Sequence, residues 1–252
     1  SLEPDLPICD PHHHFWDRRP VSIPYQRYLL HELNDDIYSG HNIISTVFLE
    51  ARSMYSADST DELRSVGEVE FVQGLAAASA SGVYGSSRAA AGIMGQADLK
   101  LGADVAPVLD ALQAASPNRF RGIRHNITWN NDPTWDDRET KGVVTSPKFI
   151  DGAKVLSQKG LRLDIMQSFP QMPEIAQFAR SVPDLPIIVN HVGGVSRVGI
   201  YADKDDEIIP VWKEGVTALA ACPNVTMKLG GLGMPRFGFG WHTREVPIGS
   251  EE

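Results

Sequence analysis

The sequence predicts an α/β protein built as a (β/α)8 TIM barrel. Short apolar runs alternate with amphipathic helical patterns along most of the 252 residues, which favours a parallel sheet with helical crossovers. Polar residues capable of chemistry follow nearly every apolar run, and a barrel brings the carboxyl ends of all its strands to one face. No glycine-rich phosphate loop follows the first run, as would be typical of an open dinucleotide-binding sheet. We therefore predict a closed barrel.

The predicted strands are short apolar runs without strict alternation, as expected of strands that are buried on both faces. They cover residues 6–16, 43–51, 90–99, 120–127, 161–168, 186–194 and 224–232.

Helical periodicity separates several of these runs. Apolar residues recur at helical spacing over 105–112, 175–182 and 208–219. The segment 68–80 is compatible with a strand or a helix, and we interpret it as a helix.

The eighth βα unit of the barrel is missing from this pattern. After the seventh run only about twenty residues remain, too few for a complete further βα unit. They form a Gly/Pro-rich stretch whose end, Ser250–Glu252, could begin a helix. We therefore expect one domain over 1–252, truncated before its eighth strand. Its first and seventh strands would have unpaired edges, so we expect either a partner that fills the gap, with a homo-oligomer as one possibility, or an eighth strand that this sequence does not include.

The composition limits location and partners. The formal net charge of −9 argues against nucleic acid and anionic membrane surfaces as partners. No apolar run reaches membrane-spanning length and the first residues lack a signal-peptide pattern, so we expect a cytoplasmic protein. Cys9 and Cys222 are interpreted as reduced structural thiols.

The strongest local motif is Asp10-Pro-His12-His-His14 at the end of the first predicted strand. Because alternate strand residues face the same way, His12 and His14 should point together into the barrel, with His13 pointing out. Two such imidazoles can ligate a divalent cation or donate hydrogen bonds to a substrate oxygen. A surface histidine run or an engineered tag is the alternative, which the hydrophobic strand around the motif disfavours.

Two further strand ends carry candidate catalytic residues. His191 ends the sixth run and precedes a glycine pair, so it is a candidate third ligand or electrophile, with a purely structural histidine as the alternative. Arg124 ends the fourth run, where its guanidinium can bind a carboxylate or an oxyanion. An Arg that only bridges loop carboxylates is about as compatible with the pattern.

Weaker candidates for substrate binding are Glu50, His125, Lys228 and Trp241. Glu50 and Lys228 would equally serve as ion-pair partners at the barrel mouth, and Asp164 either faces the lumen or orients a histidine. Trp241 belongs to a set of loop aromatics that either wall a pocket or only pack; the others are Trp129, Trp135, Phe237 and Phe239.

The opening segment DPHHHFWD resembles the D-x-H-x-H-x-W start of the amidohydrolase-related family that includes 2-pyrone-4,6-dicarboxylate lactonase and L-fuconolactonase. FRGIRH, IVNHVGG and NVTMKLGGL resemble later segments of that family in the same order. The resemblance extends from Cys9 to Trp241, and its specificity comes from the ordered combination rather than from any single motif.

The resemblance implies a barrel of the amidohydrolase type that opens a lactone, of the sugar-acid or pyrone-dicarboxylate kind, by water attack on the ring ester. His12, His14 and His191 match the family's inward histidines and would be catalytic or metal ligands, and Arg124 matches an arginine near the substrate. The implied cofactor is one divalent metal such as Zn²⁺, or none, because some relatives bind a metal and the pyrone lactonases work without one. The lack of a fifth-strand Lys or His speaks against a binuclear centre.

The family also has an essential Asp at the end of its eighth strand, and no residue here matches it. The expected partner is a small-molecule lactone or carboxylate. The alternatives are a metal-dependent decarboxylase of the same superfamily and a catalytically inactive truncated barrel.

Overall fold

A computed structural model of the chain describes residues 3–19, 25–133, 138–246 and 248–249. The chain divides into two compact units. The first comprises Ser1–Asp98 and Asp104–Arg124, and the second comprises Leu99–Ala103 and His125–Glu252. Two sequence-based expectations, a pocket role for Trp135 and a helix that begins at Ser250, lie outside the described residues.

The first unit is built on parallel strands that follow one another in chain order, β1 to β4. Their bounds are β1 Ile8–His13, β2 Ile43–Leu49, β3 Arg88–Gly95 and β4 Phe120–Asn126, of which β4 belongs to this unit up to Arg124. β3 is buried along nearly its whole length, which explains why its sequence is apolar without alternation.

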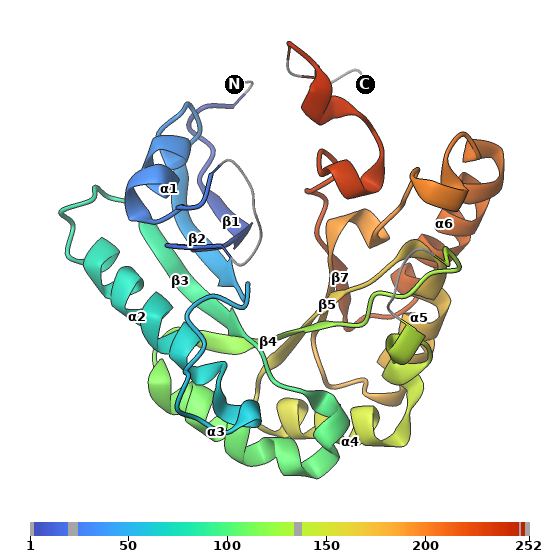
Figure 1. The fold of residues 1–252 in the computed structure, drawn as a ribbon, viewed down its shortest axis with the longest axis horizontal. Coiled ribbons are helices and arrows are strands. Elements are labelled where there is room, and N and C mark those ends of the chain that lie inside the picture. The colour runs from blue at the N-terminus through green and yellow to red at the C-terminus, as the bar shows by residue number, and fades with distance from the viewer. Residues whose placement is uncertain (1–2, 20–24, 134–137, 247, 250–252) are drawn as a thin grey trace. The chain divides into compact units, whose positions relative to one another are not determined.

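The helices of the first unit cover one face of these strands (Figure 1). They are α1 Leu30–Ile37, α2 Val66–Ala80 and α3 Ala106–Ala115. The predicted helix at 68–80 is therefore confirmed. The core beneath the helices is aromatic and aliphatic, with the rings of Phe15 and Phe48 stacked at 5.9 Å between centroids.

The second unit repeats this arrangement with shorter strands, also parallel and in chain order. Its strands are β5 Arg162–Met166, β6 Ile187–Val189 and β7 Val225–Met227. Its helices are α4 Pro147–Gln158, α5 Met172–Ser181 and α6 Asp205–Ala220, which pack against the strands and one another (Figure 1). Phe149 and Phe178 lie in its core and meet edge to face at 5.5 Å.

Short 3-10 helices join these elements. They cover Asp61–Leu63, Leu99–Val105, Arg138–Thr140, Val143–Thr145, Phe169–Gln171, His191–Gly193, Gly199–Tyr201, Pro235–Phe237 and Trp241–Thr243.

Each predicted apolar run contains a strand, so the predicted β/α alternation is confirmed. Some predicted runs extend beyond the observed ends of their strands. The sixth strand ends at Val189, because His191 and Val192 adopt left-handed backbone angles, with φ of 49° and 53°, that a strand does not accommodate. Within the described ranges, no helix is both long and apolar enough to cross a membrane.

Candidate functional site

His12 and His14 lie side by side at the carboxyl end of β1, as the two-residue period of a strand predicts. Their Nε2 atoms are 3.2 Å apart, and Nδ1 of His14 is 2.8 Å from the carbonyl oxygen of Leu49. Because a carbonyl only accepts hydrogen bonds, Nδ1 of His14 carries the proton and its Nε2 presents a lone pair in the neutral ring. The backbone of β2 therefore orients His14 with Nε2 toward His12.

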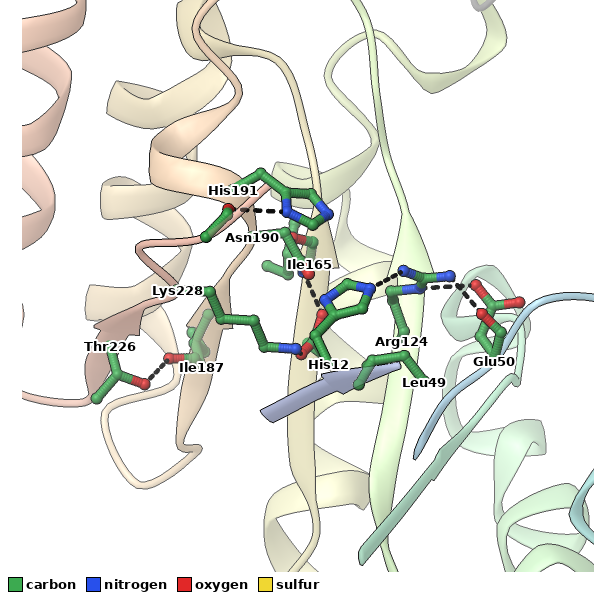
Figure 2. A network of polar contacts seen from close by, with 12 residues as sticks. His12, Leu49, Glu50, Arg124, Ile165, Ile187, Asn190, His191, Thr226 and Lys228 are labelled. Carbon is green, nitrogen blue, oxygen red and sulfur yellow. Dashed lines mark hydrogen bonds and ion pairs between the residues drawn. The ribbon is translucent and has the colours of Figure 1, made fainter. Parts of the chain in front are cut away.

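Arg124, at the end of β4, lies between His12 and Glu50 (Figure 2). Its Nε donates to Oε1 of Glu50 at 2.9 Å, a second guanidinium nitrogen donates to the Glu50 carbonyl, and a third lies 3.4 Å from Nε2 of His12. Both side chains are about nine-tenths buried, with exposures of 12% and 10%. The structure thus shows the carboxylate-bridging arrangement that the sequence left open for Arg124.

These contacts place the Nε2 lone pair of His14 against Nε2 of His12. A guanidinium only donates hydrogen bonds, so its approach to Nε2 of His12 favours a lone pair on that atom. The lone pair of His14 faces the same atom at 3.2 Å. Two lone pairs repel at this distance unless a proton or another electrophilic centre lies between them, so the pair is suited to bind an electron-poor group.

The geometry of the pair also fits a divalent cation. Two nitrogens bound tetrahedrally to Zn²⁺ at the usual bond length are about 3.3 Å apart, close to the 3.2 Å observed. The hydrogen bond from His14 to Leu49 is the outer contact typical of a histidine that ligates a metal. Across the described ranges, no group of three His, Cys, Asp or Glu side chains is arranged to hold a metal.

His13 has a different environment from its two neighbours. It is buried, its Nε2 lies 2.8 Å from the Thr46 hydroxyl, and its ring contacts those of Phe15 and Phe48. Burial lowers its pKa to about 4, so the ring is neutral at ordinary pH. This packing agrees with the expectation that His13 faces away from the His12–His14 pair.

Glu68 of α2 is a residue of this region that sequence reasoning missed. It is fully buried, and its Oε1 accepts hydrogen bonds from the backbone N–H of Ala51 at 2.9 Å and of Ser53 at 2.7 Å. It therefore holds the loop that directly follows Glu50. The available signal was one of two acids, Glu68 and Glu70, at the start of the largely apolar segment EVEFVQGLAAASA.

His191, in the second unit, lies in a tight turn after β6. Its Nδ1 is 3.1 Å from the carbonyl oxygen of Gly230, which directs the Nε2 lone pair away from this contact. The indole of Trp212 donates to the carbonyl of Val192 at 2.7 Å and supports the turn. Residue 231 must be glycine, because φ is +99° there and a Cβ would lie 2.1 Å from Nδ1 of His191.

Lys228 and Asp164 form a buried ion pair in the same unit, with Nζ 2.7 Å from Oδ2. Their exposed fractions are 9% and 1%. Asn190 donates from its amide to the other carboxylate oxygen of Asp164 and to the carbonyl of Ile165. Lys228 thus forms an ion pair, while its substrate role stays a prediction, and Asn190 is a partner of Asp164 that the sequence did not indicate.

The remaining candidates of the second unit make aromatic contacts. His125 is buried with its ring edge-on to Phe149 of α4 at 5.0 Å. Trp241 is half-buried and its ring lies 4.9 Å from that of Phe239. A substrate role for either residue stays a prediction.

A family model described as amidohydrolase matches residues 9–246. The chain therefore belongs to the amidohydrolase family and is a hydrolase of that class, with a fold of the (β/α)-barrel type.

Two curated proteins are similar in sequence to this chain. The chain is 28% identical over 243 residues to the uncharacterized protein y4mH of Sinorhizobium fredii, covering 91% of this chain and 74% of that protein. It is 25% identical over 114 residues to an L-fucono-1,5-lactonase of Burkholderia multivorans. That alignment covers 45% of this chain and 36% of the lactonase.

Solved structures share the fold. An amidohydrolase from Burkholderia multivorans, crystallised with bound zinc, superposes with a TM-score of 0.64 at 23% identity, covering 89% of this chain and 69% of that one. A probable 2-pyrone-4,6-dicarboxylic acid hydrolase from Acinetobacter baumannii superposes with a TM-score of 0.54 at 12% identity, covering 89% and 70%.

Proposed function

We propose that the protein opens a lactone by attack of water on the ring ester. The observation that carries the proposal is the His12–His14 pair, whose Nε2 atoms lie 3.2 Å apart at the end of β1. The L-fucono-1,5-lactonase among the relatives supports a lactone as the substrate. Water attack converts the planar ester carbon into a tetrahedral intermediate with an oxyanion, and an electron-poor site for that oxygen lowers the barrier.

Three residues of the first unit would have separate roles in ester hydrolysis. His14, held by the Leu49 carbonyl, and His12 would hold an electron-poor centre, a proton or a divalent cation, that faces the ester carbonyl oxygen where negative charge develops. Arg124 would add positive potential beside His12 while its bonds to Glu50 keep its own position. A divalent cation, where bound, would be held by His12 and His14 and would supply Lewis-acid polarisation of the carbonyl. His191, which the contact between its Nδ1 and the Gly230 carbonyl orients within the second unit, stays a proposed catalytic residue.

A lactone panel tests the proposal, with a sugar-acid 1,5-lactone and 2-pyrone-4,6-dicarboxylate as its first members. His14→Asn should lower kcat/KM on the best substrate by about a hundredfold or more, since removal of one group that stabilises the oxyanion has an effect of that size. His242→Asn, at an exposed position of the second unit, is the control and should retain wild-type activity. Full activity of His14→Asn, or release of carbon dioxide in place of ring opening, would contradict the proposal.

The same assay decides the role of a metal. Activity that is lost on chelation and restored by Zn²⁺ would show that a cation assists the histidine pair. Activity that survives exhaustive chelation, with no metal found by elemental analysis, would show that the two imidazoles assist hydrolysis without a metal.

A further inference from the structure

A single peptide group of the first unit is held from both sides. It joins Glu50 to Ala51, directly after β2. Its N–H donates to Oε1 of Glu68 at 2.9 Å, and its carbonyl oxygen accepts from the guanidinium of Arg124. Because the N–H and C=O of a trans peptide point in opposite directions, Glu68 and Arg124 lie on opposite sides of this group. The acid of α2 therefore fixes the direction in which the carbonyl points.

The loop after this peptide depends on α2 for its shape. Arg52 and Met54 have φ of 55° and 53°, a left-handed conformation that residues other than glycine rarely adopt. Such residues persist where surrounding contacts hold them. Between them, the N–H of Ser53 donates to the same Oε1 of Glu68 at 2.7 Å. The start of α2 also packs closely, because a Cβ at Gly67 would lie 2.7 Å from the carbonyl oxygen of Met54.

Glu68 holds the loop through one of its two oxygens. Both N–H groups meet Oε1, whereas Oε2 is buried and has no hydrogen-bond partner among the described residues. An amide at this position keeps the same acceptor, so Gln is the conservative replacement. Met has a similar size and no such acceptor, so it is the disruptive one.

Arg124 connects this peptide to the histidine pair. Two of its guanidinium nitrogens contact the carboxylate and the carbonyl of Glu50, and the third lies 3.4 Å from Nε2 of His12 (Figure 2). In a rigid planar group, two bound nitrogens fix the direction of the third. The carbonyl that Glu68 orients is one of these two anchors.

We propose that Glu68 is a positioning residue for ester hydrolysis, because it fixes the peptide that anchors Arg124 beside His12. Glu68 acts through Arg124 and is not itself a catalytic residue. The inference rests on the proposed function, in which Arg124 adds positive potential next to the histidine pair. Every contact in this series lies within the first unit.

The side-chain N–H resonances of Arg124 test the positioning without turnover. In ¹⁵N-labelled protein they are assigned by their absence from Arg124→Lys. Wild type and Glu68→Gln should show sharp resonances, shifted from those of exposed arginines, because the guanidinium is held at two points. In Glu68→Met they should broaden and move toward the exposed positions. Unchanged Arg124 resonances in Glu68→Met would overturn the inference.

Kinetics on the best substrate of the lactone panel test the consequence, with rates compared per folded protein. Glu68→Met should lower kcat/KM about tenfold or more, mainly through kcat, since it displaces a group that acts in the transition state. Glu68→Gln should stay within about threefold of the wild type, because it keeps the acceptor. Glu70→Met, at an exposed position of the same helix, is the matched control and should equal the wild type.

A double-mutant cycle with Arg124→Lys separates positioning from general stability. Lys keeps a charge beside Glu50 but cannot contact the carboxylate, the carbonyl and His12 at once. In this background Glu68→Met should cost less than about threefold, because the group that Glu68 positions is absent. An equal cost in both backgrounds would overturn the inference. Glu68→Asp, which shortens the acid by one methylene, replaces Glu68→Met in each comparison if the latter does not fold.

The two measurements also separate this inference from the proposed function. Failure of the wild type to hydrolyse any lactone, with Arg124 resonances that change in Glu68→Met, would reject the proposed function and keep the positioning of Arg124. Lactone hydrolysis that Glu68→Met leaves at the wild-type rate would reject the positioning role and keep the proposed function.

Discussion

Replacement of Glu68 by Gln tests the protonation state of this buried acid, which holds the loop that follows Glu50. Burial, with a smaller contribution from the charge of Glu50, raises the pKa of Glu68 to about 8, against the opposing effect of the two backbone N–H groups that it accepts. The folded protein therefore holds a proton on Glu68 up to about that pH, whereas the unfolded chain releases it near the ordinary value of 4.5.

The sign and size of the effect follow from this difference. Between pH 4.5 and about pH 8 unfolding releases the Glu68 proton, so the stability of the wild type falls as pH rises. At about 1.4 kcal/mol for each pH unit, the loss is on the order of 5 kcal/mol across the interval. Gln does not titrate, and its amide oxygen can accept the same bonds from Ala51 and Ser53. The free energy of unfolding of Glu68→Gln should therefore increase relative to that of the wild type as pH rises.

Urea unfolding followed by circular dichroism at pH 5, 6.5 and 8 measures this gain. The free energy of unfolding of Glu68→Gln minus that of the wild type should become more positive at each step, by several kcal/mol in total. Glu70→Gln, at an exposed position of the same helix, should show a nearly constant difference. A difference for Glu68→Gln that stays constant, or that falls with pH, would refute the assignment of a protonated Glu68 in the folded protein.

Two other substitutions probe the second unit. Lys228→Met should lower the free energy of unfolding by about 3–5 kcal/mol, because it leaves the carboxylate of Asp164 buried without its cation. Chemical denaturation measures this loss, and adding Asp164→Asn should recover much of it; a double variant no more stable than the single one would contradict the ion-pair explanation. Gly231→Ala should displace the ring of His191 and reduce lactone hydrolysis by tenfold or more, because its Cβ would lie 2.1 Å from Nδ1. Gly230→Ala, whose Cβ would have no neighbour within 4 Å, should keep its activity, and equal rates for both alanine variants would argue against a catalytic role for the histidine.

Much of the fold was predictable from the sequence because it depends on local periodicity. Strands buried on both faces require continuous apolar runs, and a helix requires apolar residues at 3.6-residue spacing. The same reasoning placed His12 and His14 on one face of β1, since alternate strand residues point the same way. Strand ends were less predictable, as at His191, because a left-handed turn depends on the contacts that stabilise it.

The partners of the polar residues were decided only by the tertiary structure. Arg124 meets Glu50 from a position 74 residues away, and the sequence left a bridging role and a substrate-binding role equally open. Which charges meet, as for Lys228 with Asp164, depends on the register and packing of separate strands, for which no local pattern exists. The residue types and their periods thus determined the strands, the helices and the histidine pair. Packing alone determined that Arg124 meets Glu50 and that Lys228 meets Asp164.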